Sequence, residues 1–526
     1  FASQIAAQKK IIKGVVKDEL NQPLLGVSVA ETGTLNGQTT NFDGEYTIEA
    51  KENGSLTFTY LGYKSKIVIV GKEKVININL DPDIQNLDEI VVIGYGAVKK
   101  GDITGSVATV NMSKLKKAPV PNFDQALAGR VAGLQVQSAS GEPGSVSTLT
   151  IRGGNSVNGD NSPLYVVDGF IVDNFNPGLV DPSDIENISI LKDASATAIY
   201  GVRGANGVII ITTKRAEVGK TKVSYEARLD VKTVSKKLEV LGAYDFLELS
   251  FEINPGNTAS RYFSVFDENL GTNVVVGGLE DYRNDIGRNW QDEAFRVAFT
   301  KTHKVNINSG TEKTKFNSSI NILEDQGSLL NSNYKRVNGR LTVDHNINDK
   351  LKATIDVLYT NYVQNGINTQ GDSSYSFLRN LIGYNPVANK FIDYEDGFDP
   401  LNDVNNSTDF INIVSWHPIV SLNNEYRRSE TDQLVTNLRL NYKISSNFTF
   451  DTSGSYNRQF RETGVFNNSQ TVYGRLINKI NGINGSLDKR TWKYFSNINT
   501  LNYKKRLGNH YFDALVGATI NIRETS

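Results

Sequence analysis

The stretch from Leu191 to Lys214 reads LKDASATAIYGVRGANGVIIITTK and joins a helix start, tight turns and an apolar strand. Asp193 and Ser195 are candidates to cap a short Ala-rich helix. Three glycines supply backbone freedom where side chains would clash: Gly201, Gly204 and Gly207. The apolar run Val208–Ile211 predicts a buried strand. This segment therefore predicts the closing part of a small, tightly packed domain.

Composition narrows the classes of function. At 526 residues the chain is too long for a single hydrophobic core, because domains usually hold roughly 100 to 200 residues. The 56 basic and 57 acidic residues give a net charge of −1, so no nucleic-acid partner is expected. With no cysteine, the chain has no disulfide, thiolate metal ligand or cysteine nucleophile. Its 45 glycines and 23 tyrosines favour turns and aromatic-rich strands, which predicts a mainly β protein.

The sequence also bears on how a membrane could be crossed. No apolar run approaches the roughly 18 residues that a transmembrane helix needs, so any crossing is expected to use strands. The start at Phe1, without an initiating Met or an apolar leader, suggests that a secretory signal has been removed. Residues 1–10 are then interpreted as an N-terminal tail.

Residues 11–83 have the alternating short strands and regular turn signals of a β-sandwich. Asp43-Gly44 is expected to make a hairpin within it. The sequences GVVKDELNQPLLGVSV, TTNFDGEYTIEA and LTFTYLGY resemble the carboxypeptidase-regulatory-like domain. That resemblance implies a common extracytoplasmic module without catalytic residues, so an enzyme is the third-ranked interpretation.

Residues 84–101 form a predicted linker that contains the isolated apolar run DEIVVIGYG. An extended, unpaired strand there would let a partner protein add it to the edge of its own sheet. The alternative is an ordinary buried strand. The run resembles the TonB box of SusC-like transporters, which implies that its residues bind the partner: Asp88, Glu89, Ile90, Val91, Val92, Ile93, Gly94, Tyr95 and Gly96.

Residues 102–215 alternate short strands with short helices, among them a predicted helix at Phe123–Val131 with Asn122 as its cap. Their blocks ITGSVATV, QALAGRVAGLQV, SGEPG, LTIRGG, PLYVVDG and DIENISILKDASA precede the opening segment. This order resembles the plug domain of TonB-dependent outer-membrane transporters of the SusC/RagA branch. The resemblance implies these plug-motif residues: Arg152, Gly153, Asp168, Gly169, Lys192, Asp193, Tyr200, Gly201, Arg203, Gly204, Asn206 and Gly207.

In residues 216–526, apolar and polar residues alternate with a period of two, as in a strand between lipid and an aqueous lumen. In the first such strand Val223 and Val231 share the apolar face, whereas Lys222 and Lys232 share the polar one. Eight further segments follow the same pattern: 304–308, 316–322, 337–347, 351–361, 434–444, 448–456, 492–503 and 512–522. Short turns alternate with long polar insertions, which favours a transmembrane barrel over a soluble β-sandwich.

The predicted fold is thus mainly β, with an N-terminal sandwich, an α+β plug and part of a large antiparallel transmembrane β-barrel. Plugged outer-membrane transporters use about 22 strands, and only roughly nine or ten are found here. An open sheet would leave costly unpaired edges in hydrocarbon. The chain is therefore expected to be the N-terminal part of a longer polypeptide.

Few residues carry chemistry. The four histidines, His303, His345, His417 and His510, are scattered without a second ligand nearby, so metal or general-base roles are not expected. Ser195 beside Asp193 lacks a nearby histidine, so helix capping explains both better than catalysis. The loop 393–403 has enough carboxylates to hold Ca²⁺ but lacks the EF-hand spacing, which favours solvated loop acids. No catalytic residue and no cofactor are assigned.

The family resemblance implies active import of a nutrient, either an oligosaccharide or a peptide. It implies as partners the TonB C-terminal domain with ExbB and ExbD, a SusD-like surface lipoprotein, with which the chain could also dimerise, and outer-membrane lipid. The implied location is the outer membrane of a Gram-negative, Bacteroidota-like bacterium, with the plug and the N-terminal domain facing the periplasm. The alternative is a non-transporting adhesin or scaffold with a passive plug. Loop aromatics could contact sugar, or equally form loop core or an interfacial girdle: Tyr375, Phe377, Tyr384, Tyr394 and Trp416.

Overall fold

The structure is a computed structural model. It describes residues 9–18, 21–34, 36–60, 63, 65–81, 90–93, 96–99, 107–110, 112–115, 120, 122–138, 140–367, 369, 377–392, 417–471, 473–474, 482–508 and 510–526. The chain divides into two compact units, one of residues 1–91 and 97–103 and one of residues 92–96 and 104–526. No helix among the described residues is both long and apolar enough to cross a membrane.

The first unit contains the predicted β-sandwich. One sheet has the order β4-β1-β7 and the other β3-β2-β5-β6. The strands are β1 (Lys9–Lys17), β2 (Ser28–Glu31), β3 (Gly37–Thr39), β4 (Glu45–Lys51), β5 (Ser55–Thr59), β6 (Lys66–Ile69) and β7 (Ile78–Asn79). Ile12, Ile48 and Phe58 are fully buried between the sheets. The expected hairpin at Asp43-Gly44 is wrong, because this turn links β3 to β4 and these strands belong to different sheets.

The second unit begins with a small α+β domain, the plug domain, built on a five-stranded mixed sheet of order β10-β15-β16-β13-β14. The strands are β10 (Val107–Thr109), β13 (Leu164–Val167), β14 (Phe170–Ile171), β15 (Ile185–Leu191) and β16 (Val208–Thr213), beside a hairpin of β11 (Leu134–Ser138) and β12 (Ser147–Ile151). The predicted buried strand is therefore the centre of the sheet. It pairs in parallel with β13 and antiparallel with β15.

Short helical segments connect these strands. They are α1 (Met112–Leu115), α2 (Phe123–Ala126), η2 (Pro177–Leu179), η3 (Pro182–Asp184), α3 (Ala194–Thr197) and η4 (Ala198–Gly204). All three predicted side-chain caps are wrong, and Ser195 lies inside α3 rather than at its N-cap position. Asn122 and Asp193 occupy the N-cap positions of α2 and α3 without a capping hydrogen bond, because their side chains bind Arg336 and Arg152 instead. Helix α2 is also shorter than the predicted Phe123–Val131.

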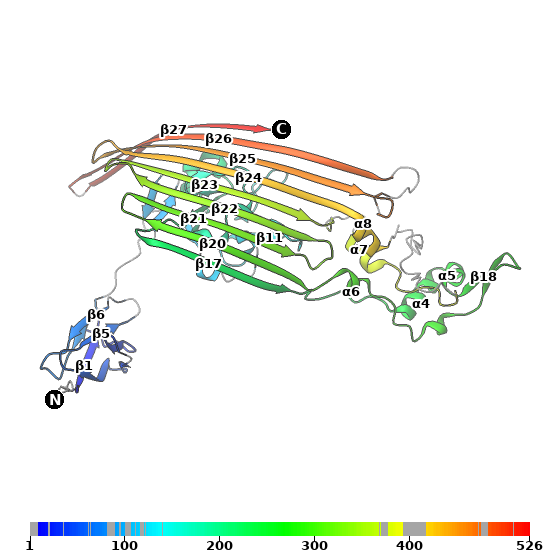
Figure 1. Ribbon diagram of the computed structural model, residues 1–526, viewed down its shortest axis with the longest axis horizontal. Helices are drawn as coiled ribbons and strands as arrows, with labels where there is room; N and C mark the ends of the chain where they lie inside the picture. The colour runs from blue at the N-terminus through cyan, green and yellow to red at the C-terminus, as the bar shows by residue number, and fades with distance from the viewer. Residues whose placement is uncertain are drawn as a thin grey trace, which may run out of the picture. The chain divides into compact units, whose positions relative to one another are not determined.

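The rest of the second unit is one antiparallel sheet of nine strands in sequence order (Figure 1). They are β17 (Gly219–Lys232), β20 (Ala298–Gly310), β21 (Thr314–Gln326), β22 (Asn333–Asn346), β23 (Leu351–Asn365), β24 (Glu425–Lys443), β25 (Phe448–Asn467), β26 (Asn484–Leu507) and β27 (His510–Thr525). All nine predicted segments are strands of this sheet. Most run further than the sequence pattern indicated, to as many as 24 residues in β26.

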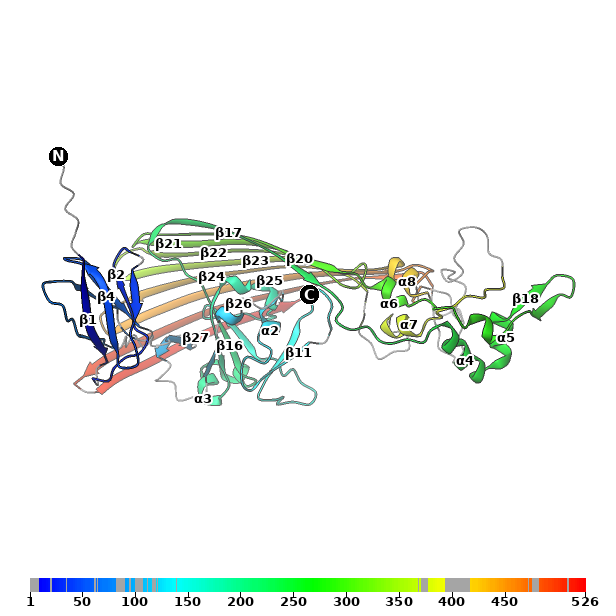
Figure 2. The same ribbon diagram turned by 90° about the horizontal axis from the view of Figure 1, so that it is seen from below.

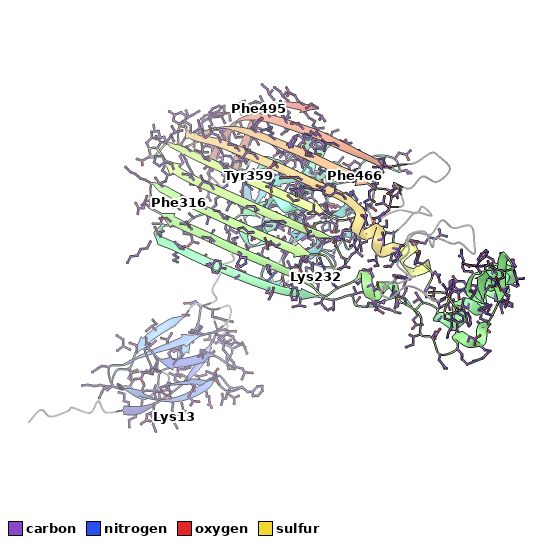
Figure 3. All side chains as sticks on the ribbon, turned by 45° about the vertical axis from the view of Figure 1, so that its right-hand side comes forward. Lys13, Lys232, Phe316, Tyr359, Phe466 and Phe495 are labelled. Carbon is purple, nitrogen blue, oxygen red and sulfur yellow. The ribbon has the colours of Figure 1, made fainter. Side chains whose placement is uncertain are left out.

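The two faces of this sheet differ as the alternation predicted. Val223 on β17 is 67% exposed, and Phe316, Tyr359 and Phe495, labelled in Figure 3, lie on the same apolar face. The opposite face is polar and packs against the plug domain, which lies to one side of the strands in Figure 2. Leu358 of β23 and Val435 of β24 join the main core of the plug.

The two ends of the sheet also differ. One end has short turns, at residues 311–313, 347–350 and 444–447. At the other end, the long-loop end, the connections are 233–297, 327–332, 366–424 and 468–483. These connections contain α4 (Ala243–Ile253), α5 (Pro255–Tyr262), β18 (Ser264–Asp267), β19 (Thr272–Val275), η5 (Leu279–Tyr282), α6 (Trp290–Ala294), α7 (Phe377–Gly383) and α8 (Pro418–Asn424).

Candidate functional site: the interface between plug and sheet

Charged side chains join the plug to the first strands of the sheet. Lys304 of β20 places Nζ 2.5 Å from Asp184 Oδ1 and 3.6 Å from Asp181 Oδ1. Arg336 of β22 places Nη2 3.5 Å from Asp181 Oδ2, and Ser319 of β21 donates to Asp184 Oδ2 at 2.8 Å. Because all of these side chains are buried, we treat them together as the Asp181 cluster.

The Asp181 carboxyl shows how this cluster acts. Burial would raise its pKa, but Lys304 and Arg336, with hydrogen bonds from Ser183, hold the pKa of Asp181 below its usual value. The carboxylate is therefore charged under all ordinary conditions and is compensated by cations of the sheet. The plug is held by paired charges that water does not screen.

A second set of charges, the Arg215 cluster, lies where the plug continues into β17. Arg215 Nη1 lies 2.9 Å from Asp356 Oδ1 of β23 and 3.8 Å from Asp344 Oδ2 of β22. Its Nη2 lies 3.6 Å from Asp168 Oδ2 within the plug. Arg340 Nη1 donates to the Lys214 carbonyl at 3.1 Å, and Arg439 Nη2 donates to the Asp168 carbonyl at 3.2 Å. These residues therefore supply three carboxylates and three guanidinium groups.

Both clusters link the plug to the sheet mainly through charge. Burying an ion pair adds little net stability, but removing one partner leaves an uncompensated charge at a cost of about 3–5 kcal/mol. Such an interface is specific in position and comes apart only when several pairs are separated together. It can hold a domain in place without the continuous apolar packing of a permanent core.

A cavity of about 490 Å³, which we call the rim cavity, lies between the plug and the long-loop end of the sheet. One wall is the plug loop SGEPG at 140–144, and the others come from β23, β24, β25 and the connections after β21 and β23. Glu142 Oε1 accepts from the Thr369 amide at 3.1 Å, and Gln364 Nε2 donates to the Pro143 carbonyl at 2.9 Å. A molecule in this cavity would contact both plug and sheet.

A second cavity of about 830 Å³ lies beside the first, between the plug and β25 to β27. Arg203 of the plug pairs with Asp173 and donates from Nη1 to the Tyr494 hydroxyl at 2.9 Å. Asp173 also pairs with Arg523 of β27. Two cations of this cavity, Arg203 and Arg523, are thus tied to a carboxylate of the plug, whereas Lys493 pairs with Glu524 of β27.

The structure divides the predicted plug-motif residues into two groups. Asp168, Gly169 and Arg203 face the sheet, as described above, with a Cβ at Gly169 falling 2.7 Å from Arg439 Nη2. The remaining motif residues act inside the plug: Arg152 pairs with Asp193, Lys192 donates to the Ala132 carbonyl, Asn206 donates to the Asp160 carbonyl, Tyr200 is buried beside β16, and Gly153, Gly201, Gly204 and Gly207 shape turns.

Two of the motif pairs have consecutive positive φ angles, and one of them, Asp168-Gly169, makes a two-residue hairpin turn. Asp168 and Gly169 have φ of 50° and 86°, and Arg152 and Gly153 have φ of 55° and 91°. Consecutive positive φ angles are required by the type I′ turn of a two-residue hairpin, and Asp-Gly is a favoured pair there. The Asp168-Gly169 turn, which joins β13 to β14, aims the Asp168 side chain at Thr213.

The predicted partner-binding strand is only partly within the described residues. Ile90–Ile93 form β8, which pairs with β9 (Gly96–Lys99) in a two-stranded sheet. The expectation that this strand is unpaired is therefore wrong for one of its edges. Within the described part of the chain, its other edge has no partner strand. Asp88, Glu89, Gly94 and Tyr95 lie outside the described residues.

Sequence reasoning missed most residues of the two clusters. It did not single out Asp181, Asp184, Arg215, Lys304, Arg336, Arg340, Asp344, Asp356 or Arg439. A signal was available, because the strand residues among them occupy polar positions of the period-two pattern, where a charge faces the lumen. Their pairing with the plug could not be read from that pattern.

Other candidates fall into structural roles or outside the described residues. His417 accepts a hydrogen bond from the Val420 amide, and Phe377 and Tyr384 are buried in a loop core. The acidic loop 393–403 and the aromatics Tyr375, Tyr394 and Trp416 lie outside the described residues. Among the described residues, no group of three His, Asp or Glu side chains could hold a metal ion.

Comparisons with known proteins agree with this architecture. Residues 99–208 match the TonB-dependent Receptor Plug Domain, and residues 12–92 match the CarboxypepD_reg-like domain. The TonB-dependent receptor SusC of Bacteroides thetaiotaomicron is 30% identical over 97% of this chain and 50% of its own length. The TonB-dependent receptor P26 of Formosa agariphila is 33% identical over 97% of this chain and 49% of its own.

Among solved structures, the RagAB peptide importer in its "open-open" state matches with a TM-score of 0.63 and 23% identity. That match covers 83% of this chain and 50% of the RagAB chain. At this identity it supports the fold alone. The chain spans about half the length of the curated relatives it matches.

Proposed function

We propose, from the premise that this chain is a SusC/RagA-like TonB-dependent receptor sequence, that its protein actively imports a nutrient across the outer membrane. TonB-dependent receptors are outer-membrane proteins of Gram-negative bacteria and are not enzymes. The proposed cargo is an oligosaccharide or a peptide. The imported molecule would pass through a barrel that the plug closes at rest.

One observation carries the proposal: a separate plug domain packs on the polar face of a long antiparallel sheet whose other face is apolar. A soluble sandwich would bury apolar residues between its sheets and expose polar ones. Here the strands expose their apolar residues and turn their polar residues toward the plug, which fits lipid outside and an aqueous lumen inside. The plug then occupies the lumen.

The connections give the proposed orientation. Barrels of this class have short periplasmic turns and longer extracellular loops. The short turns, such as 347–350, would therefore face the periplasm, and the long-loop end would face the outside. The rim cavity then lies on the extracellular side of the plug, where an arriving substrate would touch the SGEPG loop.

Energy would enter through residues 88–96. The TonB C-terminal domain, driven by ExbB and ExbD, would add this segment to its own sheet through main-chain hydrogen bonds. Force applied there would reach the plug, whose Asp181 and Arg215 clusters tie it to the sheet. A buried ion pair adds little net stability over the separated, hydrated charges, so such an interface can yield under load and form again.

A SusD-like surface lipoprotein is the proposed extracellular partner. Large apolar side chains are exposed on the connection between β17 and β20: Phe266, Leu270, Val275 and Ile286. Exposed apolar surface of this kind is what a protein partner could cover. A lipoprotein seated on this connection would cover the entrance, and the pair could dimerise.

A pair of deletions tests energisation. Deletion of Asp88–Ile93 in the full-length receptor should abolish uptake and leave substrate binding unchanged. Deletion of the six preceding residues, Pro82–Leu87, shortens the linker equally and should retain uptake. Normal uptake by the first variant would refute the mechanism.

A binding experiment separates import from the adhesin or scaffold alternative. A peptide spanning Asn86–Gly96 should bind the isolated periplasmic domain of TonB, and the same peptide with Val92→Pro should not, because proline lacks the amide N–H that a paired strand donates. Absence of binding by the unmodified peptide would favour the passive plug.

A further inference from the structure

Two arginines of the rim cavity differ from every other cation described at the interface. Arg427 of β24 and Arg461 of β25 both line the cavity and are half-buried. Neither guanidinium has an ion pair or side-chain hydrogen bond with any described residue. By contrast, Lys304, Arg203 and Arg215 each pair with a carboxylate.

The register places the two arginines on the same face of the sheet. Ser429 lies opposite Thr463, and their hydroxyls are 3.1 Å apart. Arg427 lies two residues before Ser429 on β24, and Arg461 lies two residues before Thr463 on β25. Because the strands are antiparallel, the two arginines lie on opposite sides of the Ser429–Thr463 pair. At about 3.4 Å per residue, the two Cα atoms are about 14 Å apart along the strands. The cavity therefore offers two separated positive charges with hydroxyls between them.

No described residue lining this cavity pairs with the two arginines. Glu142, the one carboxylate among the described lining residues, binds the Thr369 amide and hydroxyl through Oε1. The Arg461 guanidinium lies 5.7 Å from the centroid of the Trp492 ring, which holds it against the wall without neutralising it. Half-buried cations left without a partner are expensive, and an anionic ligand would compensate them.

We propose that the imported substrate is an acidic oligosaccharide whose carboxylate or sulfate groups bind Arg427 and Arg461. This inference rests on the proposed import function and specifies its substrate. Arginine binds such planar or multi-oxygen anions through paired hydrogen bonds, and rings of arginine select anions in other pores. The hydroxyl and amide groups of Ser429, Thr463 and Asn365 suit a polyhydroxylated chain better than a peptide of mostly apolar side chains.

The test is binding to the purified full-length receptor, measured by calorimetry without TonB. The probes are a galacturonate hexamer, a carrageenan hexamer, neutral maltohexaose and a hexa-aspartate peptide. At least one acidic hexasaccharide should bind about 10-fold or more tightly than maltohexaose, since a hydrogen bond to a charged group is worth this factor or more. Which of the two binds tells carboxylate from sulfate recognition, and added salt should weaken that binding.

Matched variants locate the effect. Arg427→Gln and Arg461→Gln should each weaken binding of the acidic hexasaccharide about 10-fold and leave maltohexaose unaffected. Arg428→Gln is the control, because the adjacent Arg428 faces the opposite side of the sheet and pairs with Glu430 at 2.9 Å. The Arg428→Gln variant should bind the acidic hexasaccharide as tightly as the unmodified receptor does.

Three results would overturn the proposal: equal affinity for neutral and acidic sugars, wild-type affinity in both glutamine variants, or tighter binding of hexa-aspartate than of either acidic sugar. The outcome is separable from that for import. Uptake of a neutral sugar that requires residues 88–96 would refute only the proposed specificity for acidic sugars. If an acidic sugar bound through Arg427 but its uptake did not require residues 88–96, only the import mechanism would be refuted.

Discussion

Arg215 Nη1 lies 2.9 Å from Asp356 Oδ1, so the residue that ends the plug is tied directly to strand β23. The two residues are 141 positions apart in the chain. The same guanidinium also faces Asp168 of the plug and Asp344 of β22. A single side chain thereby joins the plug to two strands of the sheet.

Loss of this contact should loosen the plug. Arg215→Gln would leave three carboxylates facing one another, and removal of one partner from a buried pair costs about 3–5 kcal/mol. Hydrogen exchange of the plug in the full-length receptor should accelerate accordingly. Asp356→Asn should cost less when combined with Arg215→Gln than alone, because the charges are coupled. The exposed Arg283, paired with Glu280, supplies the control Arg283→Gln, for which plug exchange should not change.

The attachment of the plug should depend on pH through Asp181. Because the folded state holds the pKa of Asp181 below its usual value, the stabilisation is complete above about pH 3.9. It is lost as the pH falls further, through the lowered folded value. Asp181→Asn should remove this acid-dependent step and weaken plug attachment at neutral pH, measured as plug protection in hydrogen exchange across pH 3 to 7.

The charge of Asp124 should affect the stability of the plug in the opposite sense to that of Asp181. Burial raises the pKa of this plug carboxyl, although the Ser147 amide donates to it at 2.8 Å. Its charged form is therefore unfavourable in the folded plug at neutral pH. Asp124→Asn should leave the thermal stability at pH 7 unchanged or raise it, in contrast to Asp181→Asn. A clear loss of stability would show that the carboxylate is required for the contact with Ser147.

The SGEPG loop offers a steric test of the rim cavity. Gly144 has φ of 77°, and a Cβ there would lie 2.2 Å from Tyr334 Cδ2. Gly144→Ala should push the loop away from β22 at a cost of about 1–3 kcal/mol and reduce substrate affinity. Gly141→Ala in the same loop meets no atom within 4 Å and should bind normally. Equal affinities would mean that substrate does not touch this loop.

Gly207 gives a similar test inside the plug. Its φ is 89°, and a Cβ would lie 2.7 Å from Ile151 Cδ1 and 3.1 Å from the Leu191 carbonyl. Gly207→Ala should destabilise the plug by about 1–3 kcal/mol, because both the backbone conformation and the packing oppose a side chain. Thermal unfolding of the full-length receptor, followed by plug proteolysis, would measure this loss. Wild-type resistance to proteolysis would contradict it.

The sequence by itself determined the features that repeat locally. Alternation of apolar and polar residues is set by the geometry of a strand, so it identified all nine long strands and the outward face of Val223. The β-branched run from Val208 and the glycines around it likewise determined the central strand of the plug and its turns. These patterns depend only on neighbours in the chain.

Only the tertiary structure decided which charges meet. The caps expected of Asn122 and Asp193 are replaced by contacts with Arg336, which is buried, and with Arg152, because tertiary contacts with a guanidinium compete with one local hydrogen bond. Arg215 finds Asp356, and Arg427 finds no described carboxylate, for reasons of strand register and plug position. Such pairings join residues from 41 to 214 positions apart, and no local pattern in the sequence records them.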